Sequence, residues 1–91
     1  MININLVLKL GIMKKNGFYT EFDSVNFKFK SISELHACDN VNDWLNTNID
    51  KAYNYAELVL CSNTLKHSGF LIGTFKKIKL KNRGYKWIVS L

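Results

Sequence analysis

The sequence predicts an α+β domain with a mostly antiparallel sheet of four to five strands, in the order β-hairpin, helices, β-hairpin, with one or two helices packed on one face. Three observations predict it: hydrophobic residues alternate near the start, recur at three- and four-residue intervals in the middle, and alternate again near the end. The chain has 91 residues, of which 47% are hydrophobic, and no proline. We therefore expect a single folded domain over residues 1–91.

The first hairpin is predicted from the start of the chain. Hydrophobic residues occupy every even position from 2 to 10, which is the period of a half-buried strand. The turn MKKNG follows, and even positions 18–22 align with even positions 8–12 if the register pairs even with even. From Val25 onward the hydrophobic residues stand at odd positions, which indicates a turn or bulge at Asp23-Ser24. Either a third strand or a bent second strand satisfies this change.

Two helices are predicted in the middle of the chain. Ser31 and Glu34 have the spacing of a capping box, so a short helix is expected to begin near Ser33. A second helix is expected to follow, because its hydrophobic residues recur at three- and four-residue intervals. These residues are Leu45, Ile49, Ala52, Ala56, Val59 and Leu60.

The last third is predicted to form the second hairpin around the turn KNRG. If Leu80 pairs with Tyr85, the register turns Trp87 into the core and sets Lys79 directly opposite Lys86. Like charges that face each other across an antiparallel pair are unfavourable, and an anion or acidic surface would neutralise them. Lysines on a sheet edge also prevent aggregation between strands, so this alternative stays open.

The charge is distributed unevenly along the chain. Residues 21–57 carry all seven acids and three lysines, whereas residues 58–91 carry seven basic residues and no acid. We expect folding to gather the basic side chains of the last third on one exposed sheet surface and to leave the acids with the helices. Such a surface favours a polyanion or an acidic protein, although a purely solubilising role is an alternative.

No cofactor, metal or catalytic signature is found. Cys38 and Cys61 stand outside any zinc or disulfide pattern and are expected to be reduced. His36 and His67 have no sequence relation to each other, so no catalytic residue is predicted. No stretch approaches the roughly 20 hydrophobic residues that span a bilayer. We expect a cytoplasmic protein without a membrane partner.

The candidate binding site is the stretch KKIKLKNRGYKW. Because twelve of the thirteen basic residues of the chain are lysine, which lacks the bidentate fork of arginine, contacts to nucleic acid are expected to involve the backbone and to be largely independent of sequence. Tyr85 or Trp87 is available for stacking on bases if its ring faces outward. The predicted binding residues are Lys76, Lys77, Lys79, Lys81, Arg83, Tyr85 and Lys86.

The segments SGFLIGTFKKIKL and GYKWIVSL, preceded by a helix, resemble the closing helix and hairpin of small phage-encoded anti-CRISPR proteins. The resemblance covers about a third of the chain. It implies a compact, non-enzymatic α+β protein that binds the protein subunits of a host surveillance complex and stops target DNA from docking.

The same tail is similar to the closing strands of RelE/ParE-type toxins, in which a basic sheet cleaves RNA or grips a gyrase. Those toxins usually carry a helical hairpin near the start, where this chain has a predicted β-hairpin. Three hypotheses follow, in this order: a phage or mobile-element inhibitor of a host nucleic-acid-processing complex, a sequence-independent nucleic-acid-binding module, and a ribonuclease toxin.

Overall fold

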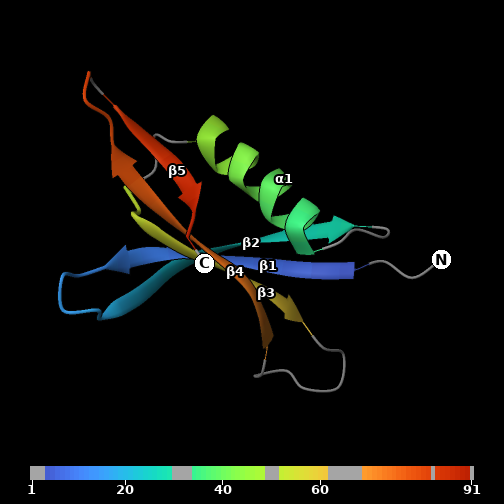
Figure 1. Cartoon of the computed structure of the whole chain (residues 1–91). Coiled ribbons are helices and arrows are strands. Elements are labelled where there is room, and N and C mark those ends of the chain that lie inside the picture. Colours follow the sequence, from blue (N-terminus) through green and yellow to red (C-terminus); the bar gives the residue numbers. More distant parts are fainter. Residues whose placement is uncertain (1–3, 30–33, 49–51, 62–68, 83, 91) are drawn as a thin grey trace.

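The computed structural model of the chain describes residues 4–29, 34–48, 52–61, 69–82 and 84–90. It contains a five-stranded antiparallel sheet in the order β2-β1-β3-β4-β5, with one helix packed on it (Figure 1). The predicted α+β class is therefore confirmed. The elements are β1 (Ile4–Met13), β2 (Tyr19–Phe29), α1 (Glu34–Thr47), β3 (Tyr55–Cys61), β4 (Gly69–Lys79) and β5 (Tyr85–Val89).

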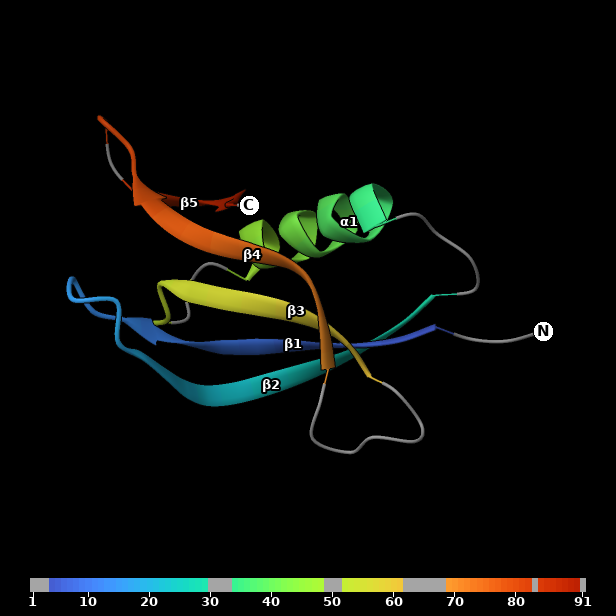
Figure 2. The same cartoon turned by 60° about the horizontal axis from the view of Figure 1, so that its bottom comes forward.

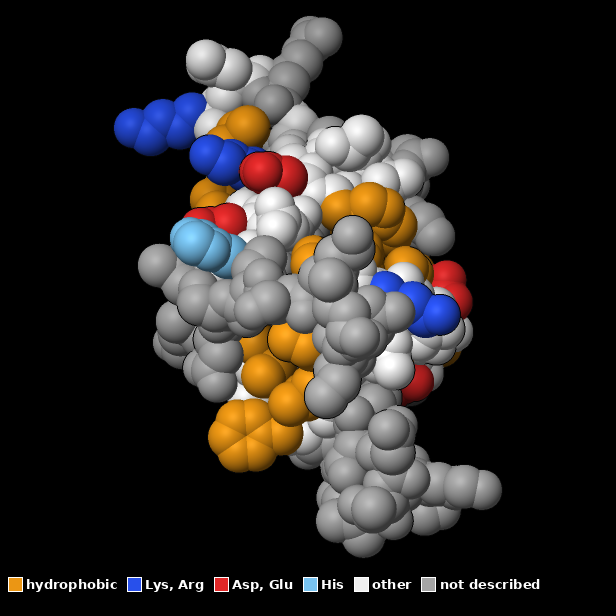
Figure 3. All heavy atoms as spheres, turned by 90° about the vertical axis from the view of Figure 1, so that its right-hand side faces the viewer, with side chains coloured by type: hydrophobic (Ala, Val, Ile, Leu, Met, Phe, Trp, Pro, Cys, Tyr) orange, Lys and Arg blue, Asp and Glu red, His pale blue; other side chains and the backbone are white. Residues whose placement is uncertain are grey.

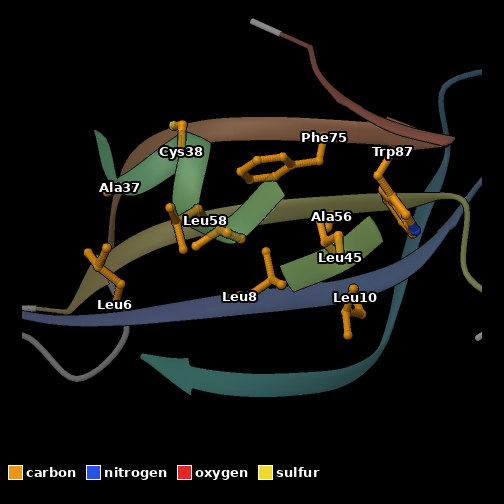
Figure 4. Close-up of a cluster of buried hydrophobic side chains, with 11 residues drawn as sticks. Leu6, Leu8, Leu10, Ala37, Cys38, Leu45, Ala56, Leu58, Phe75 and Trp87 are labelled. Carbon is orange, nitrogen blue, oxygen red and sulfur yellow. The ribbon is translucent and has the colours of Figure 1, made fainter. Parts of the chain in front are cut away.

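The hydrophobic core lies between α1 and one side of the sheet, which we call the helix face (Figure 4). The other side is called the open face. As predicted, the even-numbered leucines of β1 point into the core, and α1 adds residues spaced three or four apart. Trp87 points inward as expected and is the largest fully buried side chain, followed by Phe75. The core residues are Leu6, Leu8, Leu10, Ala37, Cys38, Val41, Leu45, Ala56, Leu58, Phe75 and Trp87.

β2 is one bent strand, which confirms the second of the two alternatives. Thr20 pairs with Ile12, even with even as predicted, but Val25 pairs with Leu8 because the register shifts between Leu10 and Gly11. The register passes over Phe22, which is 60% exposed. The extra residue of this bulge turns the odd positions that follow it toward the helix face.

The predicted second helix is wrong, because its second half forms strand β3. Ala56, Leu58 and Leu60 alternate toward the helix face, while Tyr55 and Glu57 point to the open face. The hydrophobic residues of this segment fit both the three-to-four-residue period of a helix and the two-residue period of a strand. The strand forms because β3 pairs with β1 on one side and with β4 on the other, and such pairing outweighs local helical spacing.

α1 covers the helix face and also the outer edge of β5. β4 bends, so that β5 lies beside the helix (Figures 1 and 2). The Asn46 side chain accepts a 2.8 Å hydrogen bond from the Trp87 N–H and donates a 3.1 Å bond to the Trp87 carbonyl. Asn54 makes the same pair of bonds to Met13, at 2.8 and 3.1 Å. In both places an asparagine amide replaces the backbone of a neighbouring strand.

Replacing Asn46 with alanine is expected to lower the free energy of unfolding by about 1–3 kcal/mol, because the Trp87 N–H and carbonyl lose both partners. The uncovered edge should also promote self-association. Urea denaturation and sedimentation velocity measure the two effects. Asn26→Ala, at an exposed position of β2, is the control and should change stability by less than about 0.5 kcal/mol. Equal effects of the two variants would contradict the edge-covering role.

Candidate binding surface

The β4–β5 hairpin carries the predicted site, but its register differs by one residue from the prediction. Lys79 pairs with Tyr85 and Lys77 with Trp87, and the pairing continues to the bond from the Leu80 N–H to the Gly84 carbonyl. The core decides this register, because buried Phe75 must share the helix face with Trp87, and both are odd-numbered. The expected opposition of Lys79 and Lys86 is therefore wrong.

The register divides the lysines of the hairpin between both faces of the sheet. Lys76 and Lys86 point to the open face, whereas Lys77 and Lys79 lie on the side of Trp87 and Tyr85. The expectation of a single basic surface is wrong for this reason. The basic groups instead surround a two-stranded ribbon.

Lys77 differs from the other lysines of the hairpin. Its Nζ lies 5.4 Å from the centre of the Tyr85 ring and 5.7 Å from that of the Trp87 ring, within the range of cation–π attraction. Partial burial disfavours its charged form and lowers the pKa of Lys77. The Lys77 side chain therefore joins the tip of the hairpin to the core, which makes it a structural element of the site.

The remaining lysines are solvent-exposed, and the same hairpin exposes two hydrophobic side chains. Tyr85 is 51% exposed and Leu80 is 40% exposed. None of the exposed hairpin lysines lies within 4.0 Å of a carboxylate in the part of the chain that the structure describes. These lysines are Lys76, Lys79, Lys81 and Lys86. Arg83, also predicted for the site, lies outside the described residues.

The expectation that the acids stay with the helices holds only in part: Glu34, Asp39 and Asp43 lie on α1, but three others lie on strands. Glu21 and Asp23 lie on β2, and Glu57 lies on β3. On the open face, Lys9 pairs across the strands with Glu57 and approaches Glu21 to 4.0 Å. On the sheet, the described carboxylates lie on β2 and β3, whereas the described residues of β4 and β5 include lysines and no carboxylate. The charge separation predicted along the chain is kept only in part, because β3 pairs with β4 and α1, with its acids, packs beside β5.

Two tyrosines border these carboxylates. The Tyr19 hydroxyl donates a 3.0 Å hydrogen bond to the Lys9 carbonyl, and its ring makes an edge contact with Tyr55 at 4.9 Å. Burial raises the pKa of Tyr19 well above its ordinary value of 10.0, and the negative charges of Glu57 and Glu21 add to this shift. Sequence reasoning did not find this cluster, because its members come from three strands.

The raised pKa of Tyr19 predicts a loss of stability in alkali. Tyr19 ionises near pH 10.0 in the unfolded chain but only at higher pH in the folded chain. The contribution of Tyr19 to the free energy of unfolding is therefore fully present below pH 10.0 and declines above it. Urea unfolding from pH 8 to pH 11 should show this decline, and Tyr19→Phe should make it shallower. Tyr85→Phe, at an exposed ring on the hairpin, is the control and should keep the wild-type decline. An unchanged slope in Tyr19→Phe would contradict the prediction.

Among the described residues, no set of side chains suited to catalysis lies together near the hairpin. His36 lies on the exposed side of α1. His67 and Arg83, on which the ribonuclease hypothesis depends, lie outside the described residues. The part of the chain that the structure describes holds no group of three or more His, Cys, Asp or Glu side chains placed to bind a metal ion. Cys38 is buried in the core, with its Sγ 4.0 Å from the Ile72 carbonyl oxygen.

Comparison with known proteins gives no family model, no curated protein and no solved structure that matches this chain at a significant level. Within the described residues, α1 with its 14 residues is too short and too polar to cross a membrane.

Proposed function

We propose that the protein is a non-enzymatic binding protein that acts stoichiometrically through the tip of the β4–β5 hairpin. Its partner is a nucleic-acid-processing complex of a host cell, such as a CRISPR effector, whose nucleic-acid site it blocks. The protein is then a phage or mobile-element inhibitor of the kind that the tail of the sequence resembles.

One observation carries this proposal: the end of a projecting hairpin combines exposed Tyr85 and Leu80 with exposed lysines that have no carboxylate within 4.0 Å among the described residues. Aromatic residues are enriched at protein interfaces, and tyrosine is frequent among residues that dominate binding energy. The lysines require a negative partner surface. A nucleic-acid-processing complex offers such a surface in the phosphates of its bound strands and in acidic subunits.

The proposal is tested by reversing the charge of the tip. Lys79→Glu, Lys81→Glu and Lys86→Glu are combined, and Lys77 is left intact because it contacts the core. In bacteria with an active CRISPR system, the wild-type protein should increase the survival of a targeted phage, and the triple variant should not. The partner complex is also captured from a lysate of these bacteria with the wild-type protein and with the triple variant. The affinity of the triple variant for this complex should be lower by on the order of a hundredfold. Nuclease treatment of the lysate tells whether capture depends on nucleic acid.

Lys28→Glu is the control, because Lys28 is exposed on β2 at the other end of the sheet, where it pairs with Asn5. It should inhibit like the wild type. Circular dichroism and urea unfolding must show that the triple variant remains folded. If the folded triple variant binds and inhibits as well as the wild type, the hairpin is not the contact surface and the proposed function is wrong.

A further inference from the structure

The two hairpin turns lie at the same end of the molecule, although they are far apart in the sequence. Gly11 of β1, Tyr55 of β3 and Lys76 of β4 form one row across the sheet. Since β3 is antiparallel to both neighbours, β1 and β4 run in the same direction. The turn after β1 (residues 14–18) and the described residues after β4 (80–82 and 84) therefore project from one end of the sheet (Figures 1 and 2).

The first turn has the same chemistry as the second. Lys14 and Lys15 are exposed, and the nearby Phe18 is 61% exposed. The second turn likewise combines exposed lysines with an exposed aromatic ring, that of Tyr85. The turn after β1 has a defined backbone conformation. Gly17 has a φ of 88°, which glycine adopts readily, and its N–H donates a 2.9 Å hydrogen bond to the Lys14 carbonyl. We call the two turns together the basic end.

The opposite end of the molecule has a different charge pattern. The described side chains that face the viewer in Figure 3 include both acidic and basic groups. The basic end therefore carries exposed lysines from two separate hairpins.

The geometry of the basic end favours a duplex over a single strand. Lysines on one face suffice to follow a single phosphate backbone, but the two-stranded part of this hairpin, beyond the last β3 pairing at Lys76, carries Lys86 on one face and Lys79 on the other. The major groove of B-DNA, about 12 Å wide, admits a two-stranded ribbon and has a phosphate backbone on each side. The minor groove, about 6 Å wide, is too narrow, and the major groove of A-form RNA is deep and narrow.

Resting on the proposed function, we propose that the basic end binds double-stranded DNA: the β4–β5 ribbon enters the major groove, and Lys14 and Lys15 of the other turn contact an adjacent stretch of backbone. The DNA duplex handled by the target complex is then the surface that the hairpin contacts. Because all these groups are lysines, binding is independent of base sequence.

The test measures fluorescence anisotropy of a labelled DNA duplex of two helical turns over a series of salt concentrations. Lys15→Gln and Lys28→Gln form a matched pair, since each removes one exposed lysine from the same hairpin at opposite ends. Lys81→Gln removes one from the second turn. Each phosphate contact contributes about −0.9 to the slope of log K against log salt, so Lys15→Gln and Lys81→Gln should each reduce the slope by about 1. Lys28→Gln should leave it unchanged.

Three further probes test the duplex geometry: the single strand, an RNA duplex of the same sequence, and a DNA duplex with glucosylated hydroxymethylcytosines, which fill the major groove. Each should bind more weakly than the plain duplex. Equal or tighter binding of any of them overturns the major-groove assignment. If Lys15→Gln behaves like Lys28→Gln, the first turn is not part of the site. If no DNA binds at low salt, the inference is wrong, while capture of a complex after nuclease treatment would leave the proposed function intact.

Discussion

Replacing Trp87 with alanine is expected to lower the free energy of unfolding by about 3–5 kcal/mol. Trp87 is 1% exposed and is the largest fully buried side chain among the described residues. Its loss leaves a cavity between α1, β4 and β5 and removes one of the two rings that contact Lys77. The variant should therefore also loosen the hairpin tip and weaken partner binding.

Urea denaturation followed by far-ultraviolet circular dichroism measures the effect without relying on the deleted indole. Tyr85→Ala is the control, because Tyr85 contacts Lys77 as Trp87 does but is 51% exposed. It should lower stability by no more than about 1 kcal/mol. If both variants lose the same stability, Trp87 does not have the core role that its burial indicates.

Gly11→Val is expected to lower the free energy of unfolding by at least about 2–3 kcal/mol, which is the upper part of the range for overpacked positions. A Cβ at residue 11 would lie 2.0 Å from the Thr20 carbonyl oxygen and 2.7 Å from Cε1 of Tyr19. The closest atom belongs to the backbone, so a side-chain rotation gives no relief. Gly11 also adjoins the register shift of β2, where the chain bends.

The double variant Gly11→Val with Tyr19→Ala separates the two contacts. Removing the ring should restore little stability, because the clash with the Thr20 carbonyl remains. Gly17→Ala is a second comparison: its added Cβ meets no atom within 4 Å, and only its φ of 88° opposes the change. That variant should lose about 1 kcal/mol. Wild-type stability of Gly11→Val in thermal and urea unfolding would contradict the close approach of β1 and β2.

The parts of the fold that depend on local alternation could be predicted from the sequence. The leucines of β1 face the core, β2 bends near Asp23, and Trp87 points inward, as expected. β3 was missed, because Ala56 and Leu60 satisfy a helical and a strand period at once. The choice between them is made by pairing with β1 and β4, and residues distant in the chain supply those partners.

The hairpin that carries the candidate site could be predicted from the sequence, but the arrangement of its lysines could not. A shift of one residue in the β4–β5 register moves Lys86 from the position opposite Lys79 to the position opposite Ile78. Burial of Phe75 sets this register, and its burial depends on the helix. The placement of both turns at the same end of the sheet was also beyond sequence reasoning, because it follows from the position of β3 between β1 and β4.

The central position of β3 has a consequence for folding. Each hairpin can form from neighbours in the chain, but the two join only when β3 has paired with both. The pairing of β3 with β1 closes a long loop, such as the one between Gly11 and Tyr55, whereas β3 and β4 are neighbours in the chain and pair from Cys61 and Gly69 onward; pairings of the long-range kind slow folding. The transition state is therefore expected to contain β3 docked against β1, and substitutions at Leu58 should slow refolding more than substitutions at Val89.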